Sequence, residues 1–260
     1  MVTVTAPICD LVIPAFNERE NIDALFEALA PLRESVVRHV VIADNASTDG
    51  TGDAAAAHGA IVVREQQRGY GAACLKALDW IASTDPTPDA VAFLDADLSD
   101  DPAALPSVLE PISAGRAVCV IGSRVRRAEP GALNVVQRFG NGLACTMIAV
   151  LGGRRFSDLG PLRAITWPAY RQLRMADRTW GWTVEMQMKV ALLDLPSAEV
   201  DVPYRRRRSG KSKISGTVRG VITAGSKIIS TILVLWWQRG RIRSQAQHES
   251  SSGVASSSAA

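Results

Sequence analysis

The chain has 260 residues, of which 47% are hydrophobic and 21% charged, and its formal net charge is +3. This composition is typical of a globular protein with a sizeable core, and it excludes a chain that is disordered throughout. Four cysteines without a CxxC pair argue against a disulfide framework or a zinc knot, so we expect reduced thiols at Cys9, Cys74, Cys119 and Cys145. The first residues do not resemble a signal peptide, which favours a protein of the cell interior.

The charge is unevenly distributed along the sequence. Between Val200 and Arg243 there are eleven basic residues and one acidic residue, Asp201, whereas the rest of the chain has 18 basic and 25 acidic residues. Such an asymmetry indicates an anionic partner for the C-terminal part, and phosphate, nucleic acid and an anionic membrane all satisfy it.

Apolar strands and amphipathic helices alternate in the first half of the chain. The pattern predicts strands over residues 10–16, 39–44, 60–65 and 89–95, and helices over residues 17–32, 50–59 and 69–83. Strands that are apolar on both faces and separated by helices indicate a parallel sheet covered on both sides, so the fold class is α/β. In such sheets ligands bind at the carboxyl ends of the strands.

Polar side chains follow three of these strands. They are Asn17 and Glu18 after the first strand, Asp44 and Asn45 after the second, and Asp95 and Asp97 after the fourth. Asp95 and Asp97 are two residues apart and share one face of an extended segment, so their charges repel unless a proton or a cation intervenes. Mg²⁺ or Mn²⁺ bridging to a diphosphate is one explanation. A solvated turn is the other, and it is the commoner role of such a sequence taken alone.

The second half adds a strand leading to Arg124, a mostly apolar helix over residues 133–153 and a helix over residues 180–195. The C-terminal segment 218–243 is predicted to be an amphipathic helix. Its longest apolar run, residues 228–237, is about half of what a membrane-spanning helix needs. Trp236 and Trp237 with the arginines that follow are typical of an interfacial anchor, and packing against the domain is the alternative. The tail from residue 244 is expected to be disordered.

Four segments together resemble the family-2 glycosyltransferases with a GT-A fold. They are VIPAFNERENI, VVIADNASTDGT, GYGAACLKAL and FLDADLSDDP, the last containing the DXD motif of that family. Later segments, IGSRV, QRFGN, DLGPLRAI and YRRRRSGKSKISG, are most similar to the polyprenyl-phosphate or dolichol-phosphate mannose synthase group. The resemblance implies a Rossmann-like, mostly parallel sheet flanked by helices. It also implies a catalytic domain over residues 1–217, with a nucleotide-sugar half, 1–125, and an acceptor half, 126–217.

The resemblance also implies a donor site and a metal. The residues expected to bind the donor are Pro14, Phe16, Glu18, Asp44, Asp95, Asp97, Arg205 and Lys211. Among them Asp95 and Asp97 would hold Mg²⁺ or Mn²⁺, with Asp97 the direct ligand. Strand termination at Pro14 and helix capping by Asp44 are alternative roles.

On the acceptor side, the resemblance implies that Arg124 and Arg138 hold a phosphate. Arginine suits this task because its planar fork binds phosphate bidentately. Arg163 is expected to contact the donor sugar or diphosphate, together with Asp158. Glu185 occupies the position of the acceptor base, although a phosphate acceptor already ionises with a second pKa of about 6 and would need only positioning.

The leading interpretation is therefore a metal-dependent, inverting hexosyltransferase. It would move a sugar from a nucleotide-sugar of the GDP-mannose or UDP-glucose type to a polyprenyl phosphate, in the cytoplasm and peripherally at the inner face of the cell membrane. The alternative acceptor is a small soluble molecule with a hydroxyl group. Nucleic acid is not an expected partner, because Tyr204 is the only aromatic residue in the basic run and no nucleic-acid motif accompanies it. The oligomeric state stays open.

Overall fold

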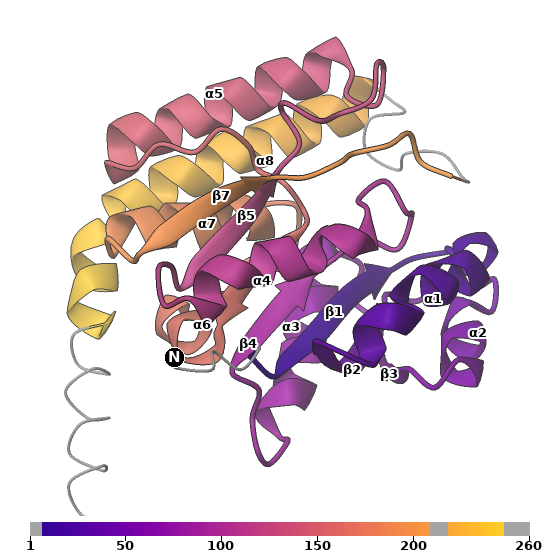
Figure 1. Ribbon diagram of the computed structural model, residues 1–260. Helices are drawn as coiled ribbons and strands as arrows, with labels where there is room; N and C mark the ends of the chain where they lie inside the picture. Colours follow the sequence, from indigo (N-terminus) through magenta and orange to yellow (C-terminus); the bar gives the residue numbers. More distant parts are fainter. Residues whose placement is uncertain (1–6, 209–217, 247–260) are drawn as a thin grey trace, which may run out of the picture.

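The computed structural model describes residues 7–208 and 218–246, which form one seven-stranded sheet with helices on both faces (Figure 1). The strand order across the sheet is β3-β2-β1-β4-β6-β5-β7. The strands are β1 (Cys9–Ala15), β2 (Val37–Asp44), β3 (Ile61–Arg64), β4 (Ala90–Phe93), β5 (Cys119–Ser123), β6 (Arg163–Thr166) and β7 (Ser197–Asp201).

The sheet is mostly parallel, as the sequence predicts. β1 pairs in parallel with both β2 and β4, and its last residue, Ala15, lies in register with Asp44 at the end of β2. The exception is β6, which runs antiparallel between β4 and β5. Because the parallel strands β1, β2 and β4 end at the same edge, the polar residues that follow them are brought together there.

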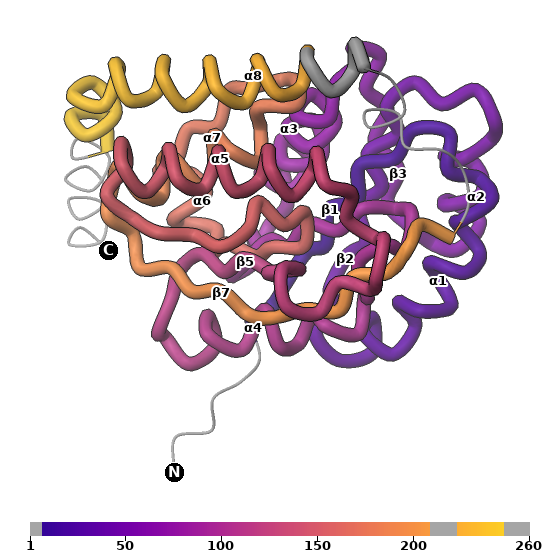
Figure 2. Tube along the Cα trace, turned by 90° about the horizontal axis from the view of Figure 1, so that it is seen from above, coloured from indigo at the N-terminus to yellow at the C-terminus, as the bar shows by residue number. Residues whose placement is uncertain are grey.

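The helices form layers on the two faces of the sheet. α1, α2 and α4 cover one face, whereas α3, α6 and α7 cover the other, and α5 and α8 pack on α7 as an outer layer (Figures 1 and 2). The helices are α1 (Arg19–Arg33), α2 (Thr51–Ala57), α3 (Tyr70–Ala82), α4 (Leu105–Ser113), α5 (Val135–Gly152), α6 (Trp167–Leu173), α7 (Trp182–Leu192) and α8 (Val218–Trp237). A 3₁₀ turn, η1 (Pro102–Ala104), precedes α4.

Local sequence explains how these helices begin and which side they bury. In α1 the buried residues Ile22, Leu25, Phe26 and Leu29 follow the three- and four-residue spacing of one helical face. α5 begins with a capping box, in which Asn134 and Gln137 exchange side-chain to backbone hydrogen bonds of 2.8 and 2.9 Å. Asn17, just before α1, accepts a hydrogen bond from the Thr48 amide.

Two helices are notably apolar. Among the described residues, α5 alone has the length and composition to cross a membrane, but one of its faces is packed against α7 and α8. A shorter apolar segment, Thr223–Trp237, makes up most of α8.

Candidate active site

The candidate site lies where β1, β2 and β4 end, and a segment from the far side of the sheet, residues 203–208, crosses it. Four carboxylates are buried there: Glu18 at 9%, Asp44 at 6%, Asp97 at 5% and Asp100 at 1% exposure. Buried carboxylates require hydrogen bonds or cations, so the partners of each one indicate what the site can bind.

The nucleoside side of the site is formed by β1 and β2. Pro14 pairs with Ala43 near the end of the strands, and Phe16 follows directly. The Arg68 guanidinium lies 3.5 Å from the centre of the Phe16 ring, a cation–π contact that fixes both side chains. Asp44 accepts a hydrogen bond of 2.9 Å from the Ser47 amide.

Asp44 is also held from the side of α2. A Cβ atom added to Gly52 would lie 2.7 Å from Oδ2 of Asp44, so glycine is required there for close packing. The carboxylate is therefore held in one orientation at the end of β2. Its expected bond to a base remains a prediction.

Asp95 and Asp97 follow β4 and differ in their surroundings. The Tyr70 hydroxyl donates to Oδ1 of Asp95 at 3.2 Å, whereas Asp97 accepts the Ser99 amide at 2.8 Å. Burial, followed by the negative charge of Asp97, raises the pKa of Asp95 to about 7. The charges of Arg124 and Arg207 lower this pKa but do not offset burial and the repulsion between the two carboxylates, and a bound cation would favour the ionised pair further.

Arg207 is the arginine of the 205–208 run that reaches these carboxylates. Its Nη2 lies 2.6 Å from Oδ2 of Asp97, and its Nη1 lies 3.4 Å from Oε1 of Glu18. The guanidinium thus links the residue after β1 to the residue after β4. Arg205 instead pairs with Asp101 at 2.8 Å, and the predicted donor residue Lys211 lies outside the described residues.

A divalent cation fits this end of the sheet. Asp100 is 1% exposed, and neither of its carboxylate oxygens has a hydrogen-bond partner among the residues that the structure describes. The charges of Asp95 and Asp97 act on it, and burial with those charges raises its pKa well above the usual range. Within 7–208 and 218–246 no group of three or more His, Cys, Asp or Glu side chains could hold a metal alone. Such an open site suits Mg²⁺ or Mn²⁺, which keep positions for water and phosphate oxygens.

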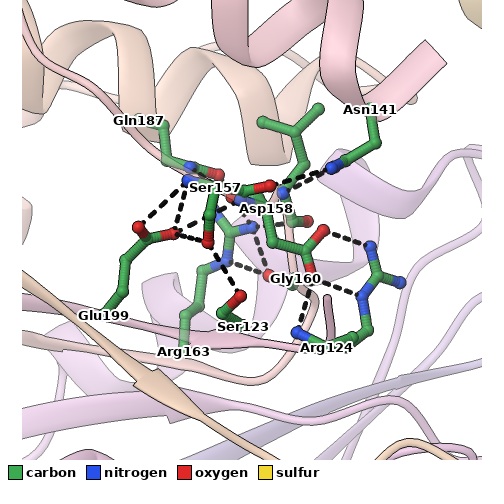
Figure 3. A network of polar contacts seen from close by, with 10 residues as sticks. Ser123, Arg124, Asn141, Ser157, Asp158, Gly160, Arg163, Gln187 and Glu199 are labelled. Atoms are coloured by element: carbon green, nitrogen blue, oxygen red, sulfur yellow. Dashed lines mark hydrogen bonds and ion pairs between the residues drawn. The ribbon is translucent and has the colours of Figure 1, made fainter. Parts of the chain in front are cut away.

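A second polar cluster lies beside the first and centres on the loop that precedes β6 (Figure 3). Arg124 forms a bidentate ion pair with Asp158, with two nitrogen–oxygen distances of 2.8 Å, and lies over the Tyr204 ring. Burial alone would lower the pKa of Arg124, but the hydrogen bonds and charge of Asp158 raise it. Arg124 is therefore a permanent cation held in one orientation.

Arg138 lies on the exposed side of α5, where its Nε donates to the Leu133 carbonyl at 3.4 Å. One turn later, Asn141 donates to the Ser157 carbonyl at 3.1 Å and accepts the Leu159 amide at 2.8 Å. These bonds flank Asp158, so the loop that fixes Arg124 is also attached to the helix that carries Arg138. The structure thus brings the two predicted acceptor arginines to neighbouring segments.

Arg163 is placed differently from what its predicted contact with substrate requires. Its side chain is 0% exposed and donates to the carbonyls of Gly160 and Thr183. It also reaches Gln187, whose amide donates to the Asp158 carbonyl (Figure 3). These bonds occupy the guanidinium and argue that Arg163 shapes the 158–162 loop rather than touching a ligand.

Glu185 is likewise surrounded by protein groups. Its carboxylate accepts the amides of Ala176 and Asp177 and pairs with Lys189 at 2.7 Å. It lines a cavity of about 340 Å³ between the 176–178 loop and α8. Three donors hold this carboxylate in place, so a positioning role fits the geometry better than that of a base.

Two side chains near the site were missed at the sequence level. Tyr70 contacts Asp95, and Arg68 covers Phe16. Both belong to the segment RGYG, whose two glycines indicate a turn of the backbone rather than a role for the neighbouring side chains. Only the position of this segment at the end of β3 and the start of α3 could have indicated them.

Comparisons with known proteins identify the family of the chain and its fold. Residues 10–176 match the family described as Glycosyl transferase family 2. An uncharacterized glycosyltransferase of Mycobacterium tuberculosis is 35% identical over 217 residues, which cover 82% of this chain and 93% of the relative. An undecaprenyl-phosphate mannosyltransferase of Micrococcus luteus is 31% identical over 228 residues, covering 80% and 88% of the two chains.

The solved structures that are similar include glucosyl-3-phosphoglycerate synthase from Mycobacterium tuberculosis, in complex with Mn²⁺, UDP and glucosyl-3-phosphoglycerate. The TM-score is 0.68 at 22% sequence identity, and the alignment covers 88% of this chain and 79% of that one. At this identity the likeness shows the GT-A fold and leaves the substrates open.

Proposed function

The chain belongs to glycosyl transferase family 2, and from that premise we propose that it is a metal-dependent hexosyltransferase. It transfers a sugar from a nucleotide-sugar, of the GDP-mannose or UDP-glucose type, to a polyprenyl phosphate. The observation that carries the acceptor is Arg138, a cation on the exposed side of an apolar helix and next to the loop that holds Arg124. A lipid phosphate matches both features of this helix, because its phosphate can pair with the cation and its hydrocarbon chain can contact the apolar side chains.

The donor is bound at the ends of the parallel strands. Phe16 and Asp44 hold the nucleoside, with Asp44 accepting a hydrogen bond from the base. Glu18 and Asp97 lie toward the ribose and the diphosphate, where Arg207 already bridges them. Arg207 is thus placed to exchange its ion pairs with the two carboxylates for ion pairs with a diphosphate. Arg205 and Lys211 belong to the same basic segment.

Asp95 and Asp97 would hold Mg²⁺ or Mn²⁺, which, when bound, neutralises negative charge on the diphosphate as it leaves. Mn²⁺ is present in the similar structure of glucosyl-3-phosphoglycerate synthase. The raised pKa of Asp95 and the unpartnered oxygens of Asp100 support a cation here.

Transfer is a single displacement. An oxygen of the acceptor phosphate forms a bond to the anomeric carbon, the bond from that carbon to the diphosphate breaks, and the nucleoside diphosphate leaves with the electron pair. One displacement inverts the anomeric configuration. Because a phosphate monoester is an anion near neutral pH, no residue has to remove a proton, which agrees with the engaged carboxylate of Glu185. Glu185 and Arg163 act as positioning residues.

The second candidate keeps the donor site and uses a small soluble acceptor. It is supported by the glucosyl-3-phosphoglycerate synthase structure, whose product carries a sugar on a soluble phosphorylated acid. The similarity to the undecaprenyl-phosphate enzyme over 80% of this chain supports the lipid acceptor. With that acceptor, the domain over residues 1–217 works at the inner face of the cell membrane, and the 218–243 helix provides peripheral contact.

The test is a donor and acceptor screen with the purified full chain. Labelled GDP- and UDP-sugars are incubated with Mn²⁺ and either polyprenyl phosphate in detergent micelles or a set of soluble hydroxyl acceptors. Label should enter the organic phase with the lipid phosphate and require Mn²⁺. Label that enters only water-soluble products would establish the second candidate, and metal-independent transfer would overturn the metal assignment.

A further inference from the structure

α5 exposes apolar side chains along the whole of one face. Val136, Phe139, Leu143 and Val150 follow each other at steps of three, four and seven residues, and Phe139 and Val150 are 72% and 76% exposed. The opposite face of the helix is buried, with Ile148 at 0%. A helix that is apolar on both faces but packed on only one exposes an apolar surface, and such a surface marks an interaction site.

α8 has the same arrangement. Ile232 and Leu235 are buried against the domain, whereas Leu233 is 47% and Trp237 is 78% exposed. α5 and α8 lie side by side and both pack on α7, outside the layer of helices that covers the sheet (Figures 1 and 2). Together the exposed residues Val136, Phe139, Leu143, Val150, Leu233 and Trp237 form one surface, which we name the α5–α8 surface.

The charges around this surface indicate which kind of partner it binds. Neither α5 nor residues 218–246 contain an aspartate or glutamate. Cations lie at both ends: Arg138 near the start of α5, on the side of the donor site, and Arg239 and Arg241 just after α8. A second copy of the chain bound through this surface would place arginines against apolar residues or other arginines, with no acid to pair them. An anionic lipid surface offers apolar chains in the middle and negative headgroups at the rim.

We propose that the α5–α8 surface docks on an anionic lipid membrane, with both helices lying flat at the level of the headgroups. The proposal adds α5 to the contact that α8 alone was expected to make, and it holds whichever acceptor the enzyme uses. Phe139 and Trp237 then insert at the boundary between headgroups and acyl chains, and Arg138 lies at phosphate level.

The test uses vesicle co-sedimentation of the full chain without substrates, so that failure of sugar transfer does not affect it. Vesicles of phosphatidylcholine alone are compared with vesicles containing about 30% phosphatidylglycerol. We expect at least tenfold tighter binding to the anionic vesicles. Phe139→Glu with Val150→Glu should weaken that binding at least tenfold, and Trp237→Glu should do the same. Ile8→Glu is the matched control, because Ile8 is 47% exposed and directly precedes β1, which lies between β2 and β4 in the sheet rather than in the outer layer.

A second measurement reports on α5 directly. Val150→Cys offers an exposed thiol among four buried cysteines, so an environment-sensitive dye can be attached there selectively. Its emission should shift to the blue when anionic vesicles are added, whereas the same dye at Ile8→Cys should not respond. Loss of binding in Trp237→Glu but not in the α5 variant would overturn the role of α5. A dimer in light scattering whose dye is already shielded without vesicles would show that a second copy covers the surface.

Discussion

At the scale of single residues, the Asp97 carboxylate links the loop after β4 to the segment after β7. It accepts the Ser99 amide, pairs with Arg207 and lies two residues from Asp95. Asp97→Asn keeps the shape and one acceptor oxygen but removes the charge. We expect sugar transfer to fall about 10²-fold or more, since one electrostatic group at a charged leaving group has effects of that size. Initial rates at saturating Mn²⁺ and donor measure it.

The matched control is Asp53→Asn, which removes an exposed carboxylate that pairs with Arg64 at 2.7 Å. It should leave the rate unchanged within about twofold, because exposed ion pairs contribute little. Equal rates for Asp97→Asn and Asp53→Asn would remove Asp97 from the site.

Asp95 makes stability depend on pH in a defined direction. Its pKa is raised to about 7 in the folded protein, whereas an aspartate in the unfolded chain ionises near pH 4. Between these values the folded state holds a proton that the unfolded state has lost. Asp95 therefore lowers the free energy of unfolding as the pH rises from about 4 to about 7, and the loss is complete above that range.

Asp95→Asn removes this effect. In EDTA the variant should gain stability relative to the parent protein as the pH rises, by on the order of 2 kcal/mol between pH 5 and pH 8. Urea titrations at several pH values measure the difference, with Asp53→Asn as the reference for loss of one charge. A difference that does not change with pH, or that shrinks toward pH 8, would contradict the raised pKa.

Glu185 gives a third prediction, which separates a positioning residue from a base. If its carboxylate only fixes Ala176, Asp177 and Lys189, then Glu185→Gln and Lys189→Met break the same ion pair and should have similar effects. We expect a loss of about 3 kcal/mol in unfolding free energy for each and an unchanged pH profile of kcat. Loss of the acidic limb of the pH–rate profile in Glu185→Gln alone would show that Glu185 is the base.

The positions of the donor residues could be predicted because they depend on local sequence. A strand end places Asp44 and Asp97 at the edge of a parallel sheet, whatever the rest of the chain does. The contacts of Arg163 and Glu185 could not be predicted in this way. Each is fixed by backbone groups contributed by other loops and helices, and the sequence around the residue does not contain that information.

At the scale of elements, the start of α3 is attached to the loop before α7. The amides of Gly71 and Ala72 donate to the carbonyls of Thr179 and Arg178. A Cβ at Gly71 would lie 2.0 Å from the Asp177 carbonyl oxygen, so no side chain fits there. The loop therefore sets the position of the first turn of α3, and with it the Tyr70 hydroxyl that contacts Asp95.

Gly71→Ala should force the loop and the helix apart and destabilise the protein by about 1–3 kcal/mol, the usual effect of overpacking. Gly142→Ala, on the exposed side of α5 with nothing within 4 Å of the new Cβ, should instead stabilise it by about 0.5–1 kcal/mol. Thermal unfolding of both variants and of the parent protein measures these two changes in stability. If both glycines behave alike, the close approach at α3 is not what restricts position 71.

The order of strands shows where prediction of elements from sequence ends. The alternation of strands and helices predicts that the first four strands are parallel, and the structure arranges them in the order β3-β2-β1-β4. It does not predict that β6 inserts antiparallel between β4 and β5, because β6 is a run of only four residues whose periodicity carries no direction. The side-chain bonds of Arg163 and Asp158 hold the loop that turns the chain into β6.

At the scale of the whole molecule, charge separates into two regions that meet at the site. Carboxylates come from the ends of β1, β2 and β4, and the arginines come from the segment after β7, which crosses over them. A nucleoside diphosphate with a divalent cation can replace the contacts between these two regions, since the cation pairs with the carboxylates and the diphosphate with the arginines. Binding should therefore require both components together.

This coupling can be measured as a shift in thermal unfolding. A ligand at about 100 times its Kd stabilises a protein by about 2.7 kcal/mol, which raises Tm by roughly 5–10 °C in a chain of this size. GDP or UDP with Mn²⁺ should reach this range, and the nucleotide that does so identifies the donor base. Either component alone should shift Tm by less than about a third of that, and Asp97→Asn should abolish the joint effect while leaving the nucleotide-only shift unchanged. Equal shifts with and without Mn²⁺ would show that the nucleotide binds through the arginines alone and that the carboxylates after β4 have another role.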